Sequence, residues 1–406
     1  MKTEKLKQNV KGYVHQFEDG GLRLLRKGQK GVIHAIFSRF GLVLILLLLQ
    51  VGLLFSIFRW FGNLWPHYFG GSVVVTSAMV IYLLNSKMDN SAKITWMVVV
   101  AIAPVVGIPM FFYVKSNFGH NILRKRLLEL EDQLRGWLPQ SQKAVEQLKA
   151  LEPGAASLAK YLYGRGGGFP VYQNTAMTYF PGGEAKFEEL LRQLETAEEY
   201  IFVEYFIIDE GLMWGKILEV LGRKALQGVD VRVIYDGVGS AATLPINYPD
   251  QLHARGILCR VFQPLLPVLS IHQNNRDHRK ICVVDGKVAF TGGVNLADEY
   301  INKKVRFGHW KDTAIKIEGD AVQSFTMMFL QMWNITERQP EDYAKYLTEK
   351  QPGFSRKDGY IIPYGDSPFD HENVGEEVYF HILNHAKKYV HIMTPYLILD
   401  NEMLTT

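Results

Sequence analysis

The sequence has little cysteine and little net charge. Its 406 residues include two cysteines, Cys259 and Cys282, and no C-x-x-C pair. Two isolated cysteines exclude a disulfide framework, so we expect both to be reduced and buried. The net charge of +4 is too small to indicate a nucleic-acid partner.

A cleaved signal peptide is not expected either, because the first apolar run begins about 40 residues into the chain and no small-residue cleavage site follows it. That run, 40–58, and a second one, 94–114, hold no charged side chain. Both match the roughly 20 residues that cross a bilayer. A third run, 69–84, is shorter and is either a short span or a buried core helix. Residues 40–114 are therefore predicted to be a transmembrane region, which makes the chain a multi-pass membrane protein.

The orientation of this region stays open. Residues 1–39 carry nine Lys or Arg side chains and three acidic ones, which favours a cytoplasmic N-terminal segment. The segment after the last run, 115–126, is basic as well. Two cytoplasmic ends need an even number of spans, yet three are counted. Either 69–84 does not cross, or one end breaks the charge rule.

The chain beyond the apolar runs has the pattern of an α/β protein. Residues 115–168 read as a helical linker, with two helices separated near Pro139 and a boundary at Gly166–Gly168. From 169 to 345, apolar runs typical of buried strands alternate with helical patterns. This alternation predicts an α/β domain with a largely parallel sheet.

Residues 346–406 begin what looks like a second copy of this domain. The segment 386–404 resembles 197–213, with Tyr389 in the place of Tyr200, and a helical pattern precedes each. We interpret 346–406 as the incomplete start of a repeat, offset by 189 residues.

The stretch 275–300 carries the densest chemical signal. His278 and Lys280 alternate on what reads as a strand and so share one face. Asp285-Gly286 predicts a tight hairpin turn, and Gly292-Gly293 allows a backbone to approach an anion. Such a set suits phosphate chemistry without a metal, since an imidazole can attack phosphorus while a lysine and an amide neutralise its oxygens.

Each of these residues also has an ordinary structural interpretation. A lone histidine on a strand is usually structural, and Lys280 could be a solvated edge residue. Asp285 could be no more than the first residue of the turn, and the glycine pair could be a bulge. The combined spacing H-x-K-x4-D followed by G-G-x-N, which ends at Asn295, is far more specific than any of its parts.

This spacing resembles the HKD motif of the phospholipase D superfamily, and with the apolar runs in front the chain resembles the bacterial cardiolipin synthases. The resemblance implies a phospholipase D-like half-domain, a mixed sheet flanked by helices, after a transmembrane region. It implies a phosphatidyltransferase of the bacterial plasma membrane that needs no cofactor. The reaction would move a phosphatidyl group between two phosphatidylglycerol molecules through a phosphohistidine, and no nucleic acid would be a partner.

The resemblance also implies a role for each site residue. His278 would be the nucleophile or general acid, with Lys280, Asn295 and Gly293 around the phosphate. Asp285 is the motif aspartate and is counted with the catalytic set, although a structural role is the expected one. The remaining two are Asp312, which would orient the histidine, and Glu204, which would line the pocket or pair with a buried cation.

The family pattern needs a second HKD motif, and the repeat offset places it near position 467. We therefore expect a truncated synthase, a fragment of a longer enzyme, or a chain that completes its site by pairing with a second copy. The competing functions are a phospholipase D-type hydrolase, with water as acceptor, and a membrane protein without catalytic activity.

Overall fold

The structure is a computed structural model that describes residues 48–49, 51–52, 56, 69–86, 88, 90–115, 118–264, 275–337, 341–347, 359–367 and 372–406. The chain divides into two compact units. One, here called the helical unit, holds residues 26–120 and 263–276. The other, here called the sheet unit, holds the segments Asn121–Phe262 and Asp277–Thr406.

Three described helices form the helical unit: α4 (Phe69–Asn85), α5 (Asn90–Ile102) and α6 (Pro104–Val114). They enclose a small apolar cluster around Leu83, Val100 and Phe111. In the part of the chain that the structure describes, none of the helices has both the length and the apolar character to cross a bilayer. Most of the predicted 40–58 span lies outside the described residues.

The predicted single span 94–114 is wrong as one continuous helix. Ala103, with φ −140° and ψ 70°, interrupts the helix, and Pro104 begins the next one. The reason is local, because proline disfavours the helical conformation of the residue before it and fits the first turn of a new helix. The predicted segment 69–84 forms α4 nearly as expected.

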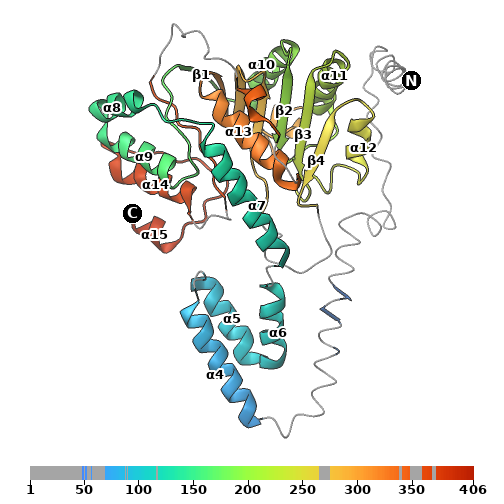
Figure 1. Cartoon of the computed structure of the whole chain (residues 1–406). Helices are drawn as coiled ribbons and strands as arrows, with labels where there is room; N and C mark the ends of the chain where they lie inside the picture. Colours follow the sequence, from blue (N-terminus) through green and yellow to red (C-terminus); the bar gives the residue numbers. More distant parts are fainter. Residues whose placement is uncertain are drawn as a thin grey trace. The chain divides into compact units, whose positions relative to one another are not determined.

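Seven described strands make the sheet of the sheet unit, in the order β1-β7-β6-β5-β2-β3-β4. β1, β2, β3 and β4 are labelled in Figure 1. Their bounds are β1 (Thr175–Phe180), β2 (Tyr200–Tyr205), β3 (Asp230–Asp236), β4 (Leu258–Phe262), β5 (Lys280–Val284), β6 (Val288–Gly292) and β7 (Ala314–Gly319). β2, β3 and β4 pair in parallel, and the other four pairs are antiparallel. The mixed sheet is confirmed, whereas the expectation of a largely parallel sheet holds only for β2 to β4.

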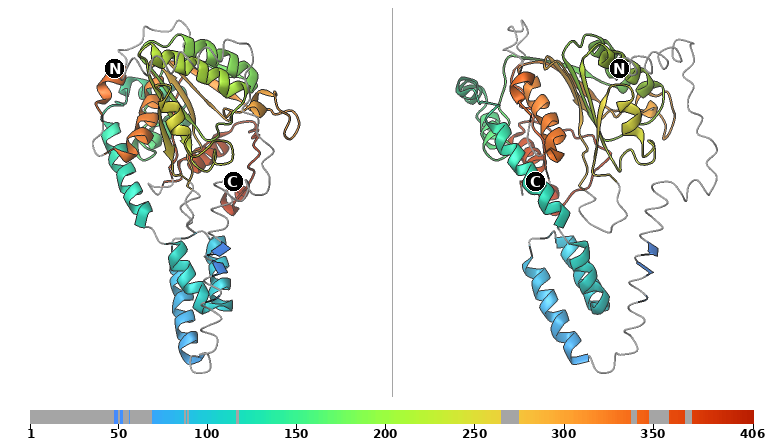
Figure 2. Two further views of the ribbon diagram at one scale, coloured as in Figure 1. Left: turned by 90° about the vertical axis from the view of Figure 1, so that its right-hand side faces the viewer. Right: turned by 45° about the vertical axis from the view of Figure 1, so that its right-hand side comes forward.

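Helices cover both faces of this sheet (Figures 1 and 2). On one face lie α10 (Gly183–Glu195), α11 (Leu212–Leu226) and α12 (Tyr248–His253), whose apolar side chains join the larger core cluster. On the other face lies α13 (Val322–Trp333), where the ring of Phe329 stacks on that of Phe202 with centroids 4.4 Å apart. The two faces match the two alternating sets of side chains along each strand.

The segments before and after the sheet pack together. The predicted linker forms three helices, α7 (Phe118–Arg135), α8 (Gln142–Leu151) and α9 (Pro153–Gly164). Leu162 of α9 packs against Val374 and Val378 of α14 (Val374–His385). The helix predicted for the start of the repeat is thus confirmed.

Because 386–404 resembles 197–213, which contains β2, a strand is expected after α14, but none is formed in the described residues. Residues 386–400 run as unpaired backbone with exposed apolar side chains, among them Met393 at 90% and Ile398 at 91% exposure, and α15 (Asn401–Thr405) follows. The pattern of a strand is present, but a strand requires a neighbour to satisfy its backbone groups.

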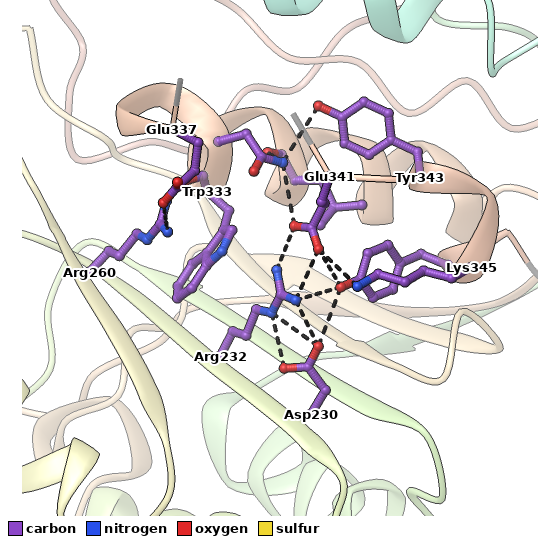
Figure 3. A network of polar contacts seen from close by, with 11 residues as sticks. Asp230, Arg232, Arg260, Trp333, Glu337, Glu341, Tyr343 and Lys345 are labelled. Atoms are coloured by element: carbon purple, nitrogen blue, oxygen red, sulfur yellow. Dashed lines mark hydrogen bonds and ion pairs between the residues drawn. The ribbon is translucent and has the colours of Figure 1, made fainter. Parts of the chain in front are cut away.

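A network around Arg232 joins β3, the strand beside the edge strand β4, to the chain beyond α13 (Figure 3). The Arg232 side chain is 7% exposed and forms ion pairs with Asp230 at 2.8 Å and Glu341 at 2.6 Å. Tyr346 of the 3-10 helix η5 (Tyr343–Tyr346) donates to Glu341 Oε2 at 2.6 Å. Two further 3-10 helices are η3 (Asp298–Ile301) and η4 (Asn334–Thr336).

Candidate active site

A tight hairpin between β5 and β6 sets the position of the predicted motif. Asp285 and Gly286 have φ of 49° and 61°, and Lys287 N donates to Val284 O at 2.9 Å. This is the two-residue turn expected for Asp-Gly, in which both central residues need positive φ. Cys282 packs in the cluster on the α10 face and Val283 in the cluster on the α13 face, which confirms the predicted alternation.

His278 precedes β5 and lies at the edge of the sheet formed by the strand ends, where its side chain is exposed to solvent. The ring packs on Phe206, with centroids 4.7 Å apart, and meets Tyr396 edge-on at 6.2 Å. Partial burial and then the charge of Lys280 lower the pKa of His278 below its usual 6.5. At neutral pH the imidazole is therefore uncharged and can act as a nucleophile.

Lys280, the first residue of β5, follows His278 by two positions and is only 4% exposed. Its Nζ donates to His278 O at 2.7 Å and lies 5.4 Å from the centre of the Phe206 ring. Burial lowers the pKa of Lys280 to about 8, while the carboxylates of Asp277 and Asp312 act in the opposite direction. The ammonium group is therefore retained at neutral pH next to the imidazole.

Gly293 brings the β6 end close to Asp312. A Cβ at residue 293 would lie 2.0 Å from Asp312 Oδ1, so a larger residue there would displace the Asp312 side chain. Asp312 Oδ1 accepts from Thr313 N at 2.8 Å, and the carboxylate contributes to the electrostatic field at Lys280. Within the described residues no hydrogen bond joins Asp312 to His278, so its predicted orienting role remains a prediction.

Asn295 is buried and both ends of its amide are in use. Oδ1 accepts from Ile207 N at 3.0 Å, and Nδ2 donates to Tyr300 Oη at 2.8 Å. The structure thus brings Asn295 to the segment that carries Phe206, next to the His278 ring. Its predicted contact with phosphate stays a prediction.

Asp285 lies apart from this group, at the other end of β5 from His278. Its carboxylate, 2% exposed, accepts from the backbone amides of Glu198, Glu199 and Tyr200 at 2.8 to 2.9 Å. These bonds attach the start of β2 to the hairpin turn. The geometry accounts for the residue as an element of the fold.

Glu204 is fully buried on the α13 face of β2, one residue before Tyr205, which pairs in register with Lys280. Neither of its carboxylate oxygens has a hydrogen-bond partner among the described residues, and Arg279 Nη1 lies 3.9 Å from Oε1. Burial and then the carboxylate of Asp277 raise the pKa of Glu204 well above its usual value. Its prediction as a partner of a buried cation is met only at this long distance.

Two buried charged residues beside the motif were not predicted from the sequence. Asp277 is 4% exposed, and its Oδ1 accepts a hydrogen bond from Arg279 N. Asp277 N donates to Asp236 Oδ2 at 3.0 Å. Lys186 of α10, 1% exposed, donates to Tyr205 Oη at 2.8 Å, and burial lowers its pKa to about 8. The helical pattern marked residue 186 as part of a helix but gave no sign that a lysine would lie inside.

No metal site is formed by the motif residues within the described part of the chain. Among the described residues, a group of three potential metal ligands within 4.8 Å of one another is formed by Glu376, Asp400 and Glu402, in and beside α14 and α15.

Comparison with known proteins shows the family to which the chain belongs. Residues 190–333 match the family model described as cardiolipin synthase, PLD-like domain. The sheet and the His278 site accordingly define a phospholipase D-like domain. A cardiolipin synthase of Alkalihalophilus pseudofirmus is 32% identical over 341 residues, which cover 82% of this chain and 67% of the relative. The chain belongs to the cardiolipin synthase family.

Two further matches complete the comparison. An uncharacterized protein of Streptococcus mutans is 51% identical over 324 residues, 80% of this chain and 70% of that protein. The phospholipase D family member Nuc from Salmonella typhimurium is 20% identical in structure-based alignment, with a TM-score of 0.29, covering 39% of this chain and 93% of Nuc. This chain spans about two thirds of the length of the curated cardiolipin synthases that it matches.

Proposed function

We propose that this chain supplies one half of a phosphatidyl-transfer site that makes cardiolipin from two phosphatidylglycerol molecules. The observation that carries the proposal is the uncharged imidazole of His278 at the sheet edge, with the buried ammonium group of Lys280 beside it. A neutral nucleophile next to a fixed cation is what attack on a phosphodiester requires.

In the proposed first step, a ring nitrogen of His278 attacks the phosphorus of one phosphatidylglycerol. A P–N bond forms, the bond from phosphorus to the glycerol oxygen breaks, and glycerol leaves with a proton from a general acid. In the second step a hydroxyl of another phosphatidylglycerol attacks, the P–N bond breaks, and the proton of that hydroxyl returns to the same group. Lys280 offsets the charge on the phosphoryl oxygens throughout.

The general acid in this scheme is the histidine of a second HKD motif, as the family resemblance implies. A further segment of chain or a second copy of the protein could contribute it, the latter as a homo-oligomer. Asn295 and Gly293 stay in the proposal beside the phosphate, and Asp312 stays as the residue that orients His278. Asp285 is assigned to positioning the hairpin.

We further propose that the chain is attached to the bacterial plasma membrane through residues 40–114. Besides the apolar runs, the exposed side chains of α4 and α5 support this proposal. Val74, Ile94 and Ile102 are 69%, 59% and 79% exposed, which is costly in water but favourable in lipid. The number of spans is left open.

The test is incubation of the full chain with phosphatidylglycerol in mixed micelles, with analysis of both products. Cardiolipin with an equal amount of glycerol supports the transferase, whereas phosphatidic acid indicates the hydrolase. We expect His278→Gln to abolish turnover, and the matched change His253→Gln, at an exposed position on α12, to leave it unchanged. Turnover that survives in His278→Gln would refute the assignment.

A further inference from the structure

A second feature lies beside the site and takes no part in the proposed chemistry. Residues 303–311, here called the basic loop, connect η3 to Asp312 and read KKVRFGHWK. Four of the nine side chains are Lys or Arg, and none is acidic. All of the loop except Trp310 is exposed.

The base of the basic loop is fixed to the active site. Trp310 N donates to Asn302 Oδ1 at 2.7 Å, and Asn302 Nδ2 donates to Trp310 O at 3.0 Å, which closes the loop. The Trp310 ring packs on Tyr300 with centroids 4.8 Å apart, and Tyr300 Oη accepts from Asn295 at 2.8 Å. These contacts connect the base of the loop, through Trp310 and Tyr300, to the predicted site residue Asn295.

The tip of the basic loop carries two bulky apolar side chains. Val305 is 82% exposed and Phe307 is 80% exposed. One exposed apolar residue on a protein surface is ordinary, but here two are set among cations on one short, closed loop. Burying them elsewhere would be favourable, so this tip indicates a binding surface.

The charge of the loop is only partly neutralised by the protein. Lys304 pairs with Asp209 at 3.4 Å and Arg306 with Glu299 at 3.0 Å, and their side chains remain 49% and 54% exposed. Lys303 and Lys311 are exposed at the two ends of the loop. The loop therefore offers positive charge around an apolar tip.

The partner that matches this pattern has an anionic surface above an apolar interior. A double-stranded nucleic acid would satisfy the cations but leave Val305 and Phe307 in water, and a single strand could stack a base on Phe307 but would leave Val305 in water. A bilayer of anionic phospholipid satisfies both, because headgroup phosphates attract lysine and arginine while the apolar tip enters the boundary of the acyl chains. We propose that the basic loop docks the sheet unit on an anionic phospholipid surface, next to the edge that carries His278.

This inference concerns contact with lipid and rests on the proposed function only for its purpose, which is to bring a phospholipid headgroup to His278. It can therefore be tested without turnover. The native cysteines are 7% and 1% exposed, so a thiol probe would react selectively at a new surface cysteine.

The experiment uses the full chain with Phe307→Cys, labelled with an environment-sensitive fluorophore. Vesicles contain either equal parts of phosphatidylglycerol and phosphatidylcholine, or phosphatidylcholine alone. We expect a blue shift with the anionic vesicles, quenched by brominated acyl chains, and a much smaller response to phosphatidylcholine. The control is Lys287→Cys with the same label, an exposed position in the β5–β6 turn at the opposite end of β5 from His278.

Adding Lys303→Gln and Lys311→Gln to the labelled chain should raise the lipid concentration for half-maximal shift at least about fivefold. The proposal is overturned by an absent shift, by an equal shift at Lys287→Cys, or by a shift that grows with protein concentration without vesicles, which would indicate a second copy as the partner. Turnover of phosphatidylglycerol is measured in the same preparation. Turnover without the shift overturns the docking proposal alone, and a shift without turnover contradicts the proposed function alone.

Discussion

His278 and Lys280 respond to pH in opposite senses in the proposed reaction. The imidazole must be neutral, so the rate rises with pH as His278 loses its proton, below the usual pKa of 6.5. The lysine must be charged, so the rate falls as the pH rises through about 8, where Lys280 loses its proton. We expect a bell-shaped dependence of glycerol release between pH 5 and 10. Lys280→Arg should move the alkaline limb upward, because guanidinium stays charged. A rate that stays level to pH 10 would contradict this role for Lys280.

The sequence predicted the local backbone around the candidate site where the signal was local. The alternation of Ile281, Cys282 and Val283 between the two faces and the Asp-Gly turn depend on neighbours in the chain, and the structure has both. It could not predict Tyr396, which meets the His278 ring from 118 positions away, or the buried Lys186. Those contacts depend on which elements lie side by side, and a single sequence does not encode that in any short pattern.

At the scale of elements, Asp285 links β2 to the β5–β6 hairpin through three backbone amides. Asp285→Ala removes a buried acceptor and places alanine at a φ of 49°, so we expect a loss of about 3 kcal/mol in the free energy of unfolding. Asp285→Asn keeps one acceptor oxygen and tolerates positive φ, and should lose about half as much. Urea denaturation measures both. An Asp285→Ala protein of unchanged stability without turnover would instead place the residue in the chemistry.

Elements were predictable where apolar periodicity was strong, as for α10, α11, β2 and β3. The order of the strands was not, because β5 lies beside β2 only through pairing across about 80 residues of chain. The segment 386–400 also shows that strand formation depends on a neighbouring strand. It carries a strand-like pattern yet stays unpaired among the described residues, since a strand exists only with its neighbour.

For the whole molecule, the proposed mechanism separates formation of the phosphohistidine from transfer of the phosphatidyl group to the second phosphatidylglycerol. His278 forms the P–N bond, slowly where the leaving glycerol must take its proton from water, whereas efficient turnover needs the general acid of the second motif. The phosphohistidine itself can be detected after reaction with phosphatidylglycerol labelled at phosphorus. After rapid quenching, label that stays on the protein in alkali and is lost in acid would report it. We expect up to one label per chain in the native protein and none in His278→Gln, with His253→Gln labelled normally. If a second-motif protein is then added together with unlabelled phosphatidylglycerol, the label should leave as cardiolipin. Cardiolipin formed without protein-bound label, or label that persists in His278→Gln, would exclude His278 as the nucleophile.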